Sequence, residues 1–464
     1  MLLAKSIMLK RKCASRMVQF LFITAGLLSV PQLFAQSNSP YSRYGLGDVV
    51  PNTNIANRAL GGIQAAYADP TTINFSNPAA YSNFIAYTTP GTKKLQSGRV
   101  ILDAGINLES HTLRSPNQTQ KFTSSNALFS YLQVGVPLRK GWGLSFGLRP
   151  LTRVSYNVIE RDRIPNEDSM VTENKGSGGS YLPTIGTGVA IKNLSLGVNV
   201  GYLFGKREIS RRRAVFNNEV EYNAANFTTN SSYGNLFLQG GAQYKINLAQ
   251  SNDRTKRTDL RLGASGNLRQ TLNGSQDIIT ETFVRDGQSG DFRLDSVSDR
   301  TGIDGKVQYP ASYTLGFVVE NQNTKNGSSW LAGVDLIQTQ WDDYRFFGER
   351  DDVQNNWQIR AGGQIRPQMA RNYFSNVTYR AGFFTGMDYI RAGGRDLPVW
   401  GITAGLGLPV ANFNRLSPGQ YTVINLALEY TKRGNDDNVL KENLFRVSLG
   451  LNFSDIWFTK RKYD

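Results

Sequence analysis

The chain has 464 residues and a formal net charge of +16, with one cysteine and one histidine. One cysteine and one histidine are too few for a zinc or iron site built from such ligands. A single cysteine also excludes a disulfide framework. The length alone would allow two or three globular domains, but most of the chain carries the period-two pattern of β-strands.

Residues 1–35 have the pattern of a cleaved secretory signal. Basic residues from Lys5 to Arg16 precede the apolar run MVQFLFITAGLLSVPQLFA, which ends at Ala35. Pro31 and the polar QSNS that follows argue against the alternative, a retained membrane helix. Removal of this segment takes away Cys13 and lowers the net charge to about +11. We expect the rest to divide into an N-terminal hatch at 36–97, a barrel at 98–454 and a periplasmic tail at 455–464.

Two short helices are predicted between residues 36 and 97. The stretch NTNIANRA is followed by Gly61 and Gly62, which favour a helix end. In SNPAAY, Asn77 suits the N-cap position and Pro78 the first helical position. Both segments are small and nearly neutral, in contrast to the strands that follow.

From residue 98 onward, apolar side chains alternate with polar or glycine positions. The segment RVILDAGINLE places Leu102, Ile106 and Leu108 on one side and Asp103 and Asn107 on the other. Most such segments are longer than the nine to eleven residues with which a tilted strand crosses a bilayer. The predicted strands are 98–110, 124–138, 141–156, 181–191, 194–209, 234–247, 258–270, 308–320, 328–340, 355–366, 372–384, 398–409, 420–432 and 442–454.

The connections between these strands alternate in length. The segments 139–140, 192–193, 321–327 and 367–371 are short, whereas 157–180, 210–233 and 271–307 are long and polar. Outer-membrane barrels have short periplasmic turns and long external loops. If residues 36–97 begin in the periplasm, every long segment lies outside. The fold class is therefore all-β: a transmembrane antiparallel barrel of about 14 strands in the outer membrane of a Gram-negative bacterium.

A barrel of this width is too wide for its own side chains to fill the centre. Residues 36–97 are the natural plug, so we expect small helices inside the lumen. The alternation turns charged residues toward them, which makes the lumen more polar than a pocket for long acyl chains. The predicted inward charges are Asp103, Glu109, Arg149, Arg261, Arg269 and Arg446.

The segment RALGGIQAAYADPTTINFSNPAAYSNF, residues 58–84, resembles the N-terminal hatch of the FadL-type (OmpP1-like) outer-membrane transporters. The segment SPYSRYGLGD and the C-terminal SDIWFTKRKYD resemble exported barrels of the Bacteroidetes. The resemblance implies a fourteen-stranded barrel with an internal hatch, passive uptake of a hydrophobic or amphipathic molecule, and no cofactor. It places along the ligand path Arg58, Gly61, Gly62, Asp69, Asn77, Pro78 and Ala79.

Catalytic and metal motifs are weak. Ser145 in GLSFG lies in the middle of a predicted strand and not in a strand–turn–helix elbow. His111, the lone histidine, would have to serve any serine–histidine pair, so we do not expect an enzyme. Asp295, Asp299 and Asp304 could bind calcium, but their spacing fits a solvated external loop better.

Two functions remain open, and they differ in what the barrel would bind. The first is a hatch-gated channel for a hydrophobic small molecule. The alternative is a non-transporting docking barrel within a secretion or protein-assembly complex, whose long loops, above all 271–307, engage other subunits. In either case Arg211, Arg212 and Arg213 could bind lipopolysaccharide phosphates or form a solvated basic loop, and nucleic acid is not an expected partner.

Overall fold

The structure is a computed structural model that places most of the chain beyond residue 38. The described residues are 39–88, 95–115, 121–163, 169–217, 219–220, 222–286, 290–368, 370, 372–410 and 420–457. The predicted signal segment 1–35 and the tail residues 458–464 therefore lie outside the described residues.

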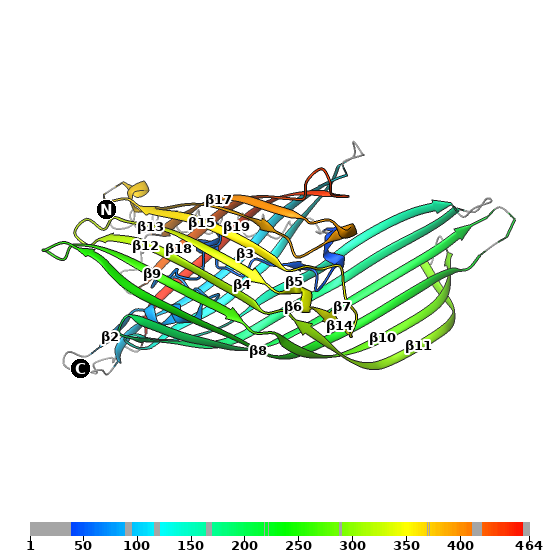
Figure 1. The fold of residues 1–464 in the computed structure, drawn as a ribbon, viewed down its shortest axis with the longest axis horizontal. Helices are drawn as coiled ribbons and strands as arrows, with labels where there is room; N and C mark the ends of the chain where they lie inside the picture. The colour runs from blue at the N-terminus through cyan, green and yellow to red at the C-terminus, as the bar shows by residue number, and fades with distance from the viewer. Residues whose placement is uncertain are drawn as a thin grey trace, which may run out of the picture. The chain divides into compact units, whose positions relative to one another are not determined.

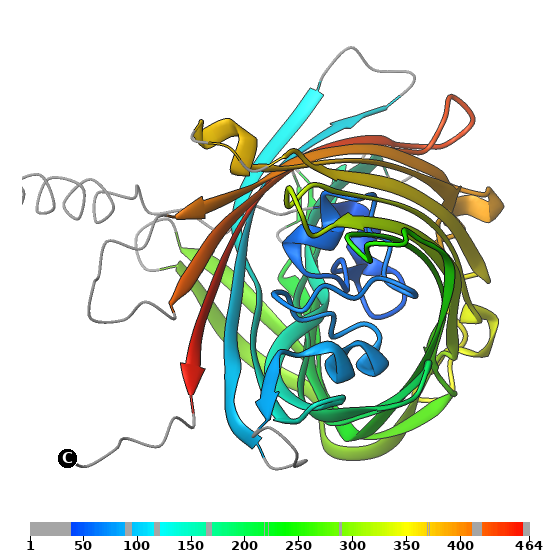
Figure 2. The same cartoon turned by 90° about the vertical axis from the view of Figure 1, so that its left-hand side faces the viewer.

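The described strands form one closed antiparallel barrel, seen end-on in Figure 2. Closure is made by the last strand, which pairs with the first wall strand so that Leu449 lies opposite Ile106. The strands are β3 (Leu95–Arg114), β4 (Lys121–Arg139), β5 (Trp142–Arg163), β6 (Ser169–Ile191), β7 (Leu194–Phe216), β8 (Ala224–Gln250), β9 (Lys256–Asn267), β10 (Gln270–Asp286), β11 (Gly290–Tyr309), β12 (Ser312–Asn323), β13 (Ser329–Thr339), β15 (Asn356–Arg366), β16 (Thr378–Met387), β17 (Pro398–Val410), β18 (Tyr421–Arg433) and β19 (Lys441–Trp457).

These sixteen segments make fourteen wall strands within the described residues. β9 and β10 pair with successive parts of β8, and β11 and β12 continue each other in the same way. The predicted barrel of about 14 strands is confirmed. The alternation also holds: Leu196 and Val198 of β7 are exposed, whereas Ser195 and Asn199 are buried. The barrel thus presents apolar side chains to lipid and polar side chains to its lumen.

The predicted long external loops are wrong, because most of their residues are strand. β5, β6, β7 and β8 continue past the membrane-facing apolar band, and β10 with β11 forms a hairpin beside them. Figure 1 shows these six strands running beyond the rest of the wall. We call this six-stranded part, formed by residues 152–163, 169–180, 205–216 and 224–234 with β10 and β11, the outer extension. Its two faces are both largely polar, so it lacks the alternation that identifies a half-buried strand.

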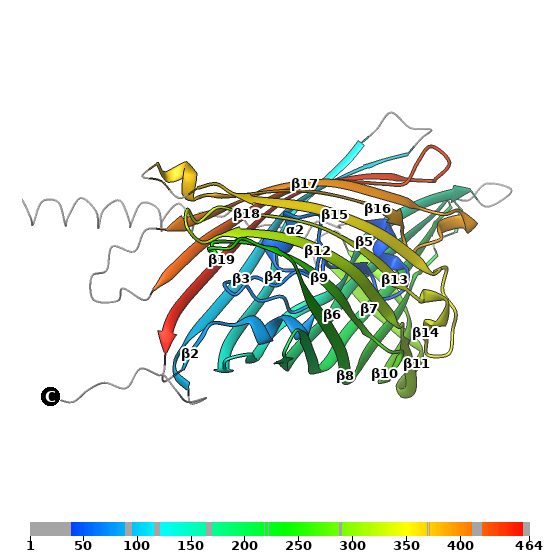
Figure 3. The same ribbon diagram turned by 60° about the vertical axis from the view of Figure 1, so that its left-hand side comes forward.

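The hatch lies inside the ring of strands, as Figures 2 and 3 show. It contains the 3-10 helix η1 (Pro40–Arg43), strand β1 (Asp48–Val49), helix α2 (Ile55–Arg58), the 3-10 helix η2 (Pro78–Asn83) and strand β2 (Ala86–Thr88). The predicted caps are present, since Asn54 and Asn77 accept from backbone N–H groups at the starts of α2 and η2. The second predicted helix forms as a 3-10 helix.

The hatch runs through the lumen from the outer end to the periplasmic end. The Ser39 N–H donates to the Ser155 carbonyl at 3.3 Å, and the Tyr41 hydroxyl donates to the Leu440 carbonyl, which precedes β19, at 2.6 Å. At the other end, β2 pairs with the first residues of β3. The expectation that this segment begins in the periplasm is therefore wrong for its first described residues, whereas β3 rises outward as predicted.

Aromatic residues close the outer end of the lumen. Trp341 stacks on Tyr389 with ring centroids 4.2 Å apart, and Tyr41, Tyr44 and Leu46 of the hatch belong to the same buried cluster. Short elements between the wall strands complete this end and the periplasmic rim: η3 (Trp341–Asp343), β14 (Arg345–Phe346), η4 (Tyr373–Asn376) and η5 (Ala392–Gly394). Among the described residues, none of the helices has the length and apolar character needed to cross a bilayer.

Candidate functional site

Arg58 connects the hatch to β3 and β19, the two strands whose pairing closes the barrel. Its guanidinium donates to Asn107 Oδ1 of β3 at 2.6 Å and to Ser448 Oγ of β19 at 3.3 Å. It also donates to the carbonyls of Pro51 and Thr53 at 3.1 and 3.2 Å. Burial lowers the pKa of the Arg58 guanidinium to about 10, so it stays charged at neutral pH. One side chain thus joins the hatch to the first and last wall strands.

Gly61 and Gly62 let the hatch backbone approach the opposite wall. Both have positive φ, +70° and +84°, which an L side chain adopts only with strain. The Gly61 N–H donates to Thr403 Oγ1 of β17 at 2.9 Å, and Arg360 Nη1 of β15 donates to the Gly62 carbonyl at 3.1 Å. The predicted hatch glycines therefore serve contact with the wall.

Asn77, Pro78 and Ala79 pack against the other side of the barrel. The Asn77 amide donates to the Ala65 carbonyl at 2.6 Å and to the Ala264 carbonyl of β9 at 3.2 Å. A Cβ at Gly197 of β7 would lie 2.3 Å from the Pro78 carbonyl carbon, so only glycine fits there. This half of the hatch is seated on glycine positions of the wall.

Asp69 has a local role. Its Oδ1 accepts from the Thr71 N–H at 2.8 Å and from the Thr71 hydroxyl at 2.6 Å, which closes a turn of the hatch. It is not among the residues that line the lumen cavity.

An ion cluster joins the outer part of the hatch to the wall. Arg433 of β18 contacts Asp48 at 3.0 Å, Asp388 at 2.7 Å and Glu442 at 3.2 Å. His111 Nδ1 lies 2.6 Å from Glu442 Oε1, and its Nε2 lies 3.3 Å from a Glu109 oxygen. Burial raises the pKa of Asp48 to about 6, although the nearby Arg433 lowers it. Because carboxylates occupy both ring nitrogens of His111, the ring is not placed to act as a base for Ser145.

A second ion cluster lies deeper in the lumen. Arg446 of β19 contacts Glu109 at 2.7 Å and also Glu429 of β18 at 2.5 Å. Of the six predicted inward charges, five are buried, whereas Arg269 is half exposed and lies 3.7 Å from Asp343 outside the lumen. Arg269 lies in the two-residue break between β9 and β10, where alternation no longer predicts the facing side.

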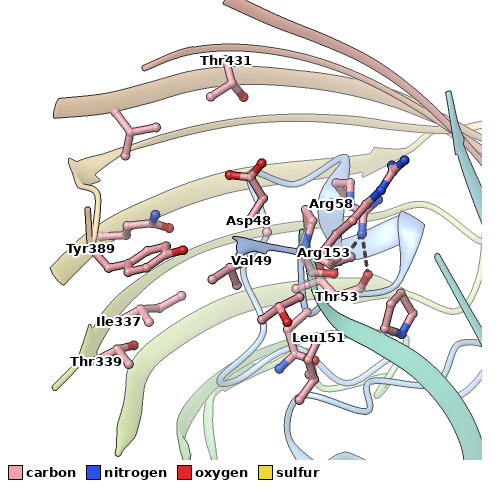
Figure 4. A pocket seen from close by; sticks show the side chains of 18 of the residues that line it. Asp48, Val49, Thr53, Arg58, Leu151, Arg153, Ile337, Thr339, Tyr389 and Thr431 are labelled. Atoms are coloured by element: carbon pink, nitrogen blue, oxygen red, sulfur yellow. Dashed lines mark hydrogen bonds between the residues drawn. The ribbon is translucent and has the colours of Figure 1, made fainter. Parts of the chain in front are cut away.

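A cavity of about 590 Å³ lies between the hatch and the wall. It meets the hatch at residues 48–53, Arg58, Gly61, Gly62 and Gln64, and not at Asn77 or Pro78. Figure 4 shows Asp48, Arg58 and Arg153 around it, with Leu151, Ile337 and Tyr389 on its apolar side. Most of its charged lining comes from the two ion clusters, so it is a mixed pocket and not a greasy one.

The cavity reaches a gap in the hydrogen bonding of the wall. The β4–β5 ladder ends where Leu132 pairs with Leu148, and beyond that point β5 pairs with β1 of the hatch through Asp48 and Arg153. Leu128 and Phe129 of β4 and Leu151 of β5 line the cavity beside this gap. We call this unpaired stretch the β4–β5 seam.

The predicted external contact residues lie on the outer extension. Arg211, Arg212 and Arg213 are in β7, so alternation places Arg212 on one face of the sheet and its two neighbours on the other. Contact with lipopolysaccharide stays a prediction. Asp295, Asp299 and Asp304 are spread along β11, and among the described residues no three His, Cys, Asp or Glu side chains gather as in a metal site.

The sequence did not indicate which charged residues of the lumen contact one another. Asp48, Arg433 and Glu442 belong to the outer ion cluster, yet they come from the hatch and from strands almost 400 residues later. Charged residues on alternating strand positions were the available sign, and the pattern identified Glu109 and Arg446 in this way. It could not specify their partners.

Comparison with known proteins gives a family and a fold. The family model described as BamG matches residues 17–464. No curated protein matches the chain. The solved toluene transporter TodX of P. putida is 15% identical, with a TM-score of 0.51 over 88% of this chain and 99% of that one. A Pseudomonas aeruginosa FadL homologue is 12% identical, with a TM-score of 0.50 over 89% and 100%. At such identities the structures establish a shared fold, and the predicted FadL-type relationship holds at that level.

Proposed function

The chain belongs to the BamG family, and we propose that it is a plugged outer-membrane barrel that acts as a docking subunit of a secretion or protein-assembly complex. It is an integral outer-membrane protein with the FadL-like barrel fold. The observation that carries the proposal is the way the hatch is held. Arg58 and residues 60–67 and 73–81 of the hatch are buried inside the lumen, with hydrogen bonds to β3 on one side of the barrel and to β9 on the other.

The anchoring favours a fixed plug over a moving gate. Release of the hatch would leave Arg58 without its partners on β3 and β19, and the buried amide of Asn77 without its carbonyls. Leaving a buried charged donor unpaired costs more than an average hydrogen bond contributes. A plug held in this way supports a barrel whose role is to present its outer surface to other proteins.

The outer extension offers such a surface. β11 pairs with β10 along its length, but on its other side only Val307 and Gln308 have a ladder partner among the described residues, namely β14. Leu294 and Val297 on β11 are more than half exposed. A strand edge with unpaired backbone groups and exposed apolar side chains can take up a strand from another chain. The β10–β11 hairpin is therefore the proposed docking element.

The experiment compares complex formation in edge variants. The protein is extracted from its native membrane in a mild detergent, and its mass is measured by size exclusion with light scattering. We expect a mass well above the monomer, and loss of the larger species in Leu294→Lys/Val297→Lys. Ile159→Lys, on the opposite edge strand of the same sheet and equally exposed, is the matched control. A monomeric wild type, or a complex unaffected by the β11 changes, would contradict the proposal.

A passive channel for a hydrophobic molecule is the second candidate. It is favoured by the β4–β5 seam, where Leu128, Phe129 and Leu151 line the lumen cavity beside strands that are not paired with each other. In liposomes loaded with a toluene-responsive dye, a channel would speed toluene entry over protein-free vesicles. A docking barrel would leave the rate unchanged, so the two candidates differ in this single measurement.

A further inference from the structure

The charges that line the lumen cavity are unevenly paired. All five carboxylates that line the cavity belong to the two ion clusters, where they contact Arg433, Arg446 and His111 and outnumber these cations. These carboxylates are Asp48, Glu109, Asp388, Glu429 and Glu442. Among the described residues, the other four arginines that line the cavity, Arg58, Arg149, Arg153 and Arg360, make no direct ion pair, and the six arginines of the lining outnumber its five carboxylates.

Arg149 of β5 is the clearest case. Its side chain is 2% exposed, and its guanidinium donates to the Phe75 carbonyl and to Gln239 Oε1, both at 3.4 Å. It also lies over the Phe75 ring, 5.0 Å from the centroid. Its Nε is buried without a hydrogen-bond partner, and among the described residues the guanidinium makes no ion pair. A buried cation is held here by weak neutral contacts alone.

Arg58 and Arg153 line the same cavity and share this deficit. Arg58 is 2% exposed and bonds only neutral oxygens, with its Nε left over. Arg153, beside Asp48 on the β5–β1 ladder, has a buried Nη1 without a partner. In Figure 4 both side chains are drawn around the cavity. With Arg360, whose Nε is also buried without a partner, four guanidinium groups line the cavity without a direct ion pair.

Buried charges in proteins are ordinarily paired, because desolvation of an isolated ion costs several kcal/mol. Guanidinium groups form their strongest bonds with carboxylate and phosphate oxygens, which accept two parallel N–H groups. We propose that the cavity binds a small polar anion, carrying carboxylate or phosphate groups, whose oxygens form the direct ion pairs that Arg58, Arg149 and Arg153 lack. The space of about 590 Å³ is within the usual range for a small-molecule site.

The same charges disfavour an apolar occupant. A hydrocarbon in this cavity would strip water from three guanidinium groups without offering them an acceptor. The anion site is therefore distinct from passage of a hydrophobic solute, and it is independent of the docking proposal, since a plugged barrel and a channel could both contain it. Failure of either proposal leaves the other standing.

The test measures thermal midpoints of the purified barrel in a non-ionic detergent at constant ionic strength. The probes are citrate and inorganic phosphate, with chloride as the reference and laurate as a carboxylate attached to an alkyl chain. We expect citrate or phosphate to raise the midpoint of the wild type in a saturable way. Arg153→Gln, which is half-buried and should fold, is expected to weaken the apparent affinity by roughly tenfold, the effect of losing one charged contact.

Variants and outcomes separate the alternatives. Arg149→Gln tests the deeper position, and Arg161→Gln, on the exposed part of β5, is the matched control that should bind as wild type. If Arg149→Gln does not fold, Arg153→Gln still decides the question. The proposal is overturned if no polar anion shifts the midpoint, if all variants respond like wild type, or if laurate alone binds, since the cavity would then recognise the alkyl chain.

Discussion

The Ser39 hydroxyl donates to Glu442 Oε2 at 3.3 Å across 403 residues of sequence, so the first described residue of the hatch is bound to the last strand of the barrel. Arg433 adds a second link by contacting both Asp48 of the hatch and Glu442. Hatch and wall are thus one folded unit at the outer end, and changes in either should be measurable in both.

Arg58→Gln should loosen the hatch. The shorter neutral side chain cannot span Asn107 and Ser448, and losing charge-assisted bonds of this kind costs about 2–3 kcal/mol. We expect faster chymotryptic cleavage at the tyrosines and phenylalanines within residues 39–88 and a lower thermal midpoint. Arg161→Gln is the control for loss of an exposed arginine. Unchanged protection in Arg58→Gln would mean that the hatch is held mainly by its other contacts.

Gly197→Ala should push the hatch helix η2 away from the wall strand β7. The new Cβ would lie 2.3 Å from the Pro78 carbonyl carbon and 2.5 Å from the Ala79 nitrogen, both backbone atoms that cannot turn away. Overpacking of this kind costs about 1–3 kcal/mol. Gly240→Ala, on neighbouring β8, meets no atom within 4 Å and should behave as wild type. Equal thermal midpoints for the two variants would contradict the described packing.

Stability should depend on pH through Asp48. Because burial raises the pKa of this carboxyl to about 6 from 3.8, the folded protein holds the proton more tightly than the unfolded chain. The contribution of Asp48 is fully present below pH 4 and is lost as pH rises through 6. Arg433, Glu442 and His111 lie near the carboxyl and modulate this window.

Asp48→Asn imitates the protonated form and tests this sign. We expect the thermal midpoints of the variant and the wild type to be similar at pH 4.5. At pH 7.5 the midpoint of the variant should be higher than that of the wild type. The comparison requires only unfolding followed by tryptophan fluorescence in detergent. A variant that loses stability most at pH 7.5 would show that the ion pair with Arg433 outweighs the burial of Asp48.

A disulfide should lock the hatch without distorting it. Ser82 Oγ of the hatch lies 2.9 Å from Ser195 Oγ of β7, and the chain has no cysteine after Cys13. Ser82→Cys/Ser195→Cys is expected to oxidise readily, because the two sulfurs would need only a small approach to bond. If the hatch is a fixed plug, the locked and reduced forms behave alike in every assay. A toluene entry rate that falls on oxidation would instead identify a moving gate.

The sequence predicted the wall because lipid and lumen impose opposite requirements on alternate residues. Each predicted strand overlaps a wall strand, for example 194–209 with β7. The outer extension escaped prediction since no lipid contacts it, and segments such as 271–307 therefore look like polar loops. The hatch residues were located by resemblance, but their partners, such as Asn107 for Arg58, depend on how the closed barrel brings distant strands together.

The position of Arg58 also constrains the order of events during biogenesis. Its partners sit on β3 and β19, so its binding site does not exist until the final strand has been synthesised and has zipped onto the first. In an insertion intermediate whose β3 and β19 are not yet paired, the hatch would lack this attachment, and the Arg58 guanidinium would have no partner on the wall. Formation of the Arg58 hydrogen bonds to β3 and β19 therefore indicates that the barrel has closed. A nascent chain arrested before residue 441 should not form them.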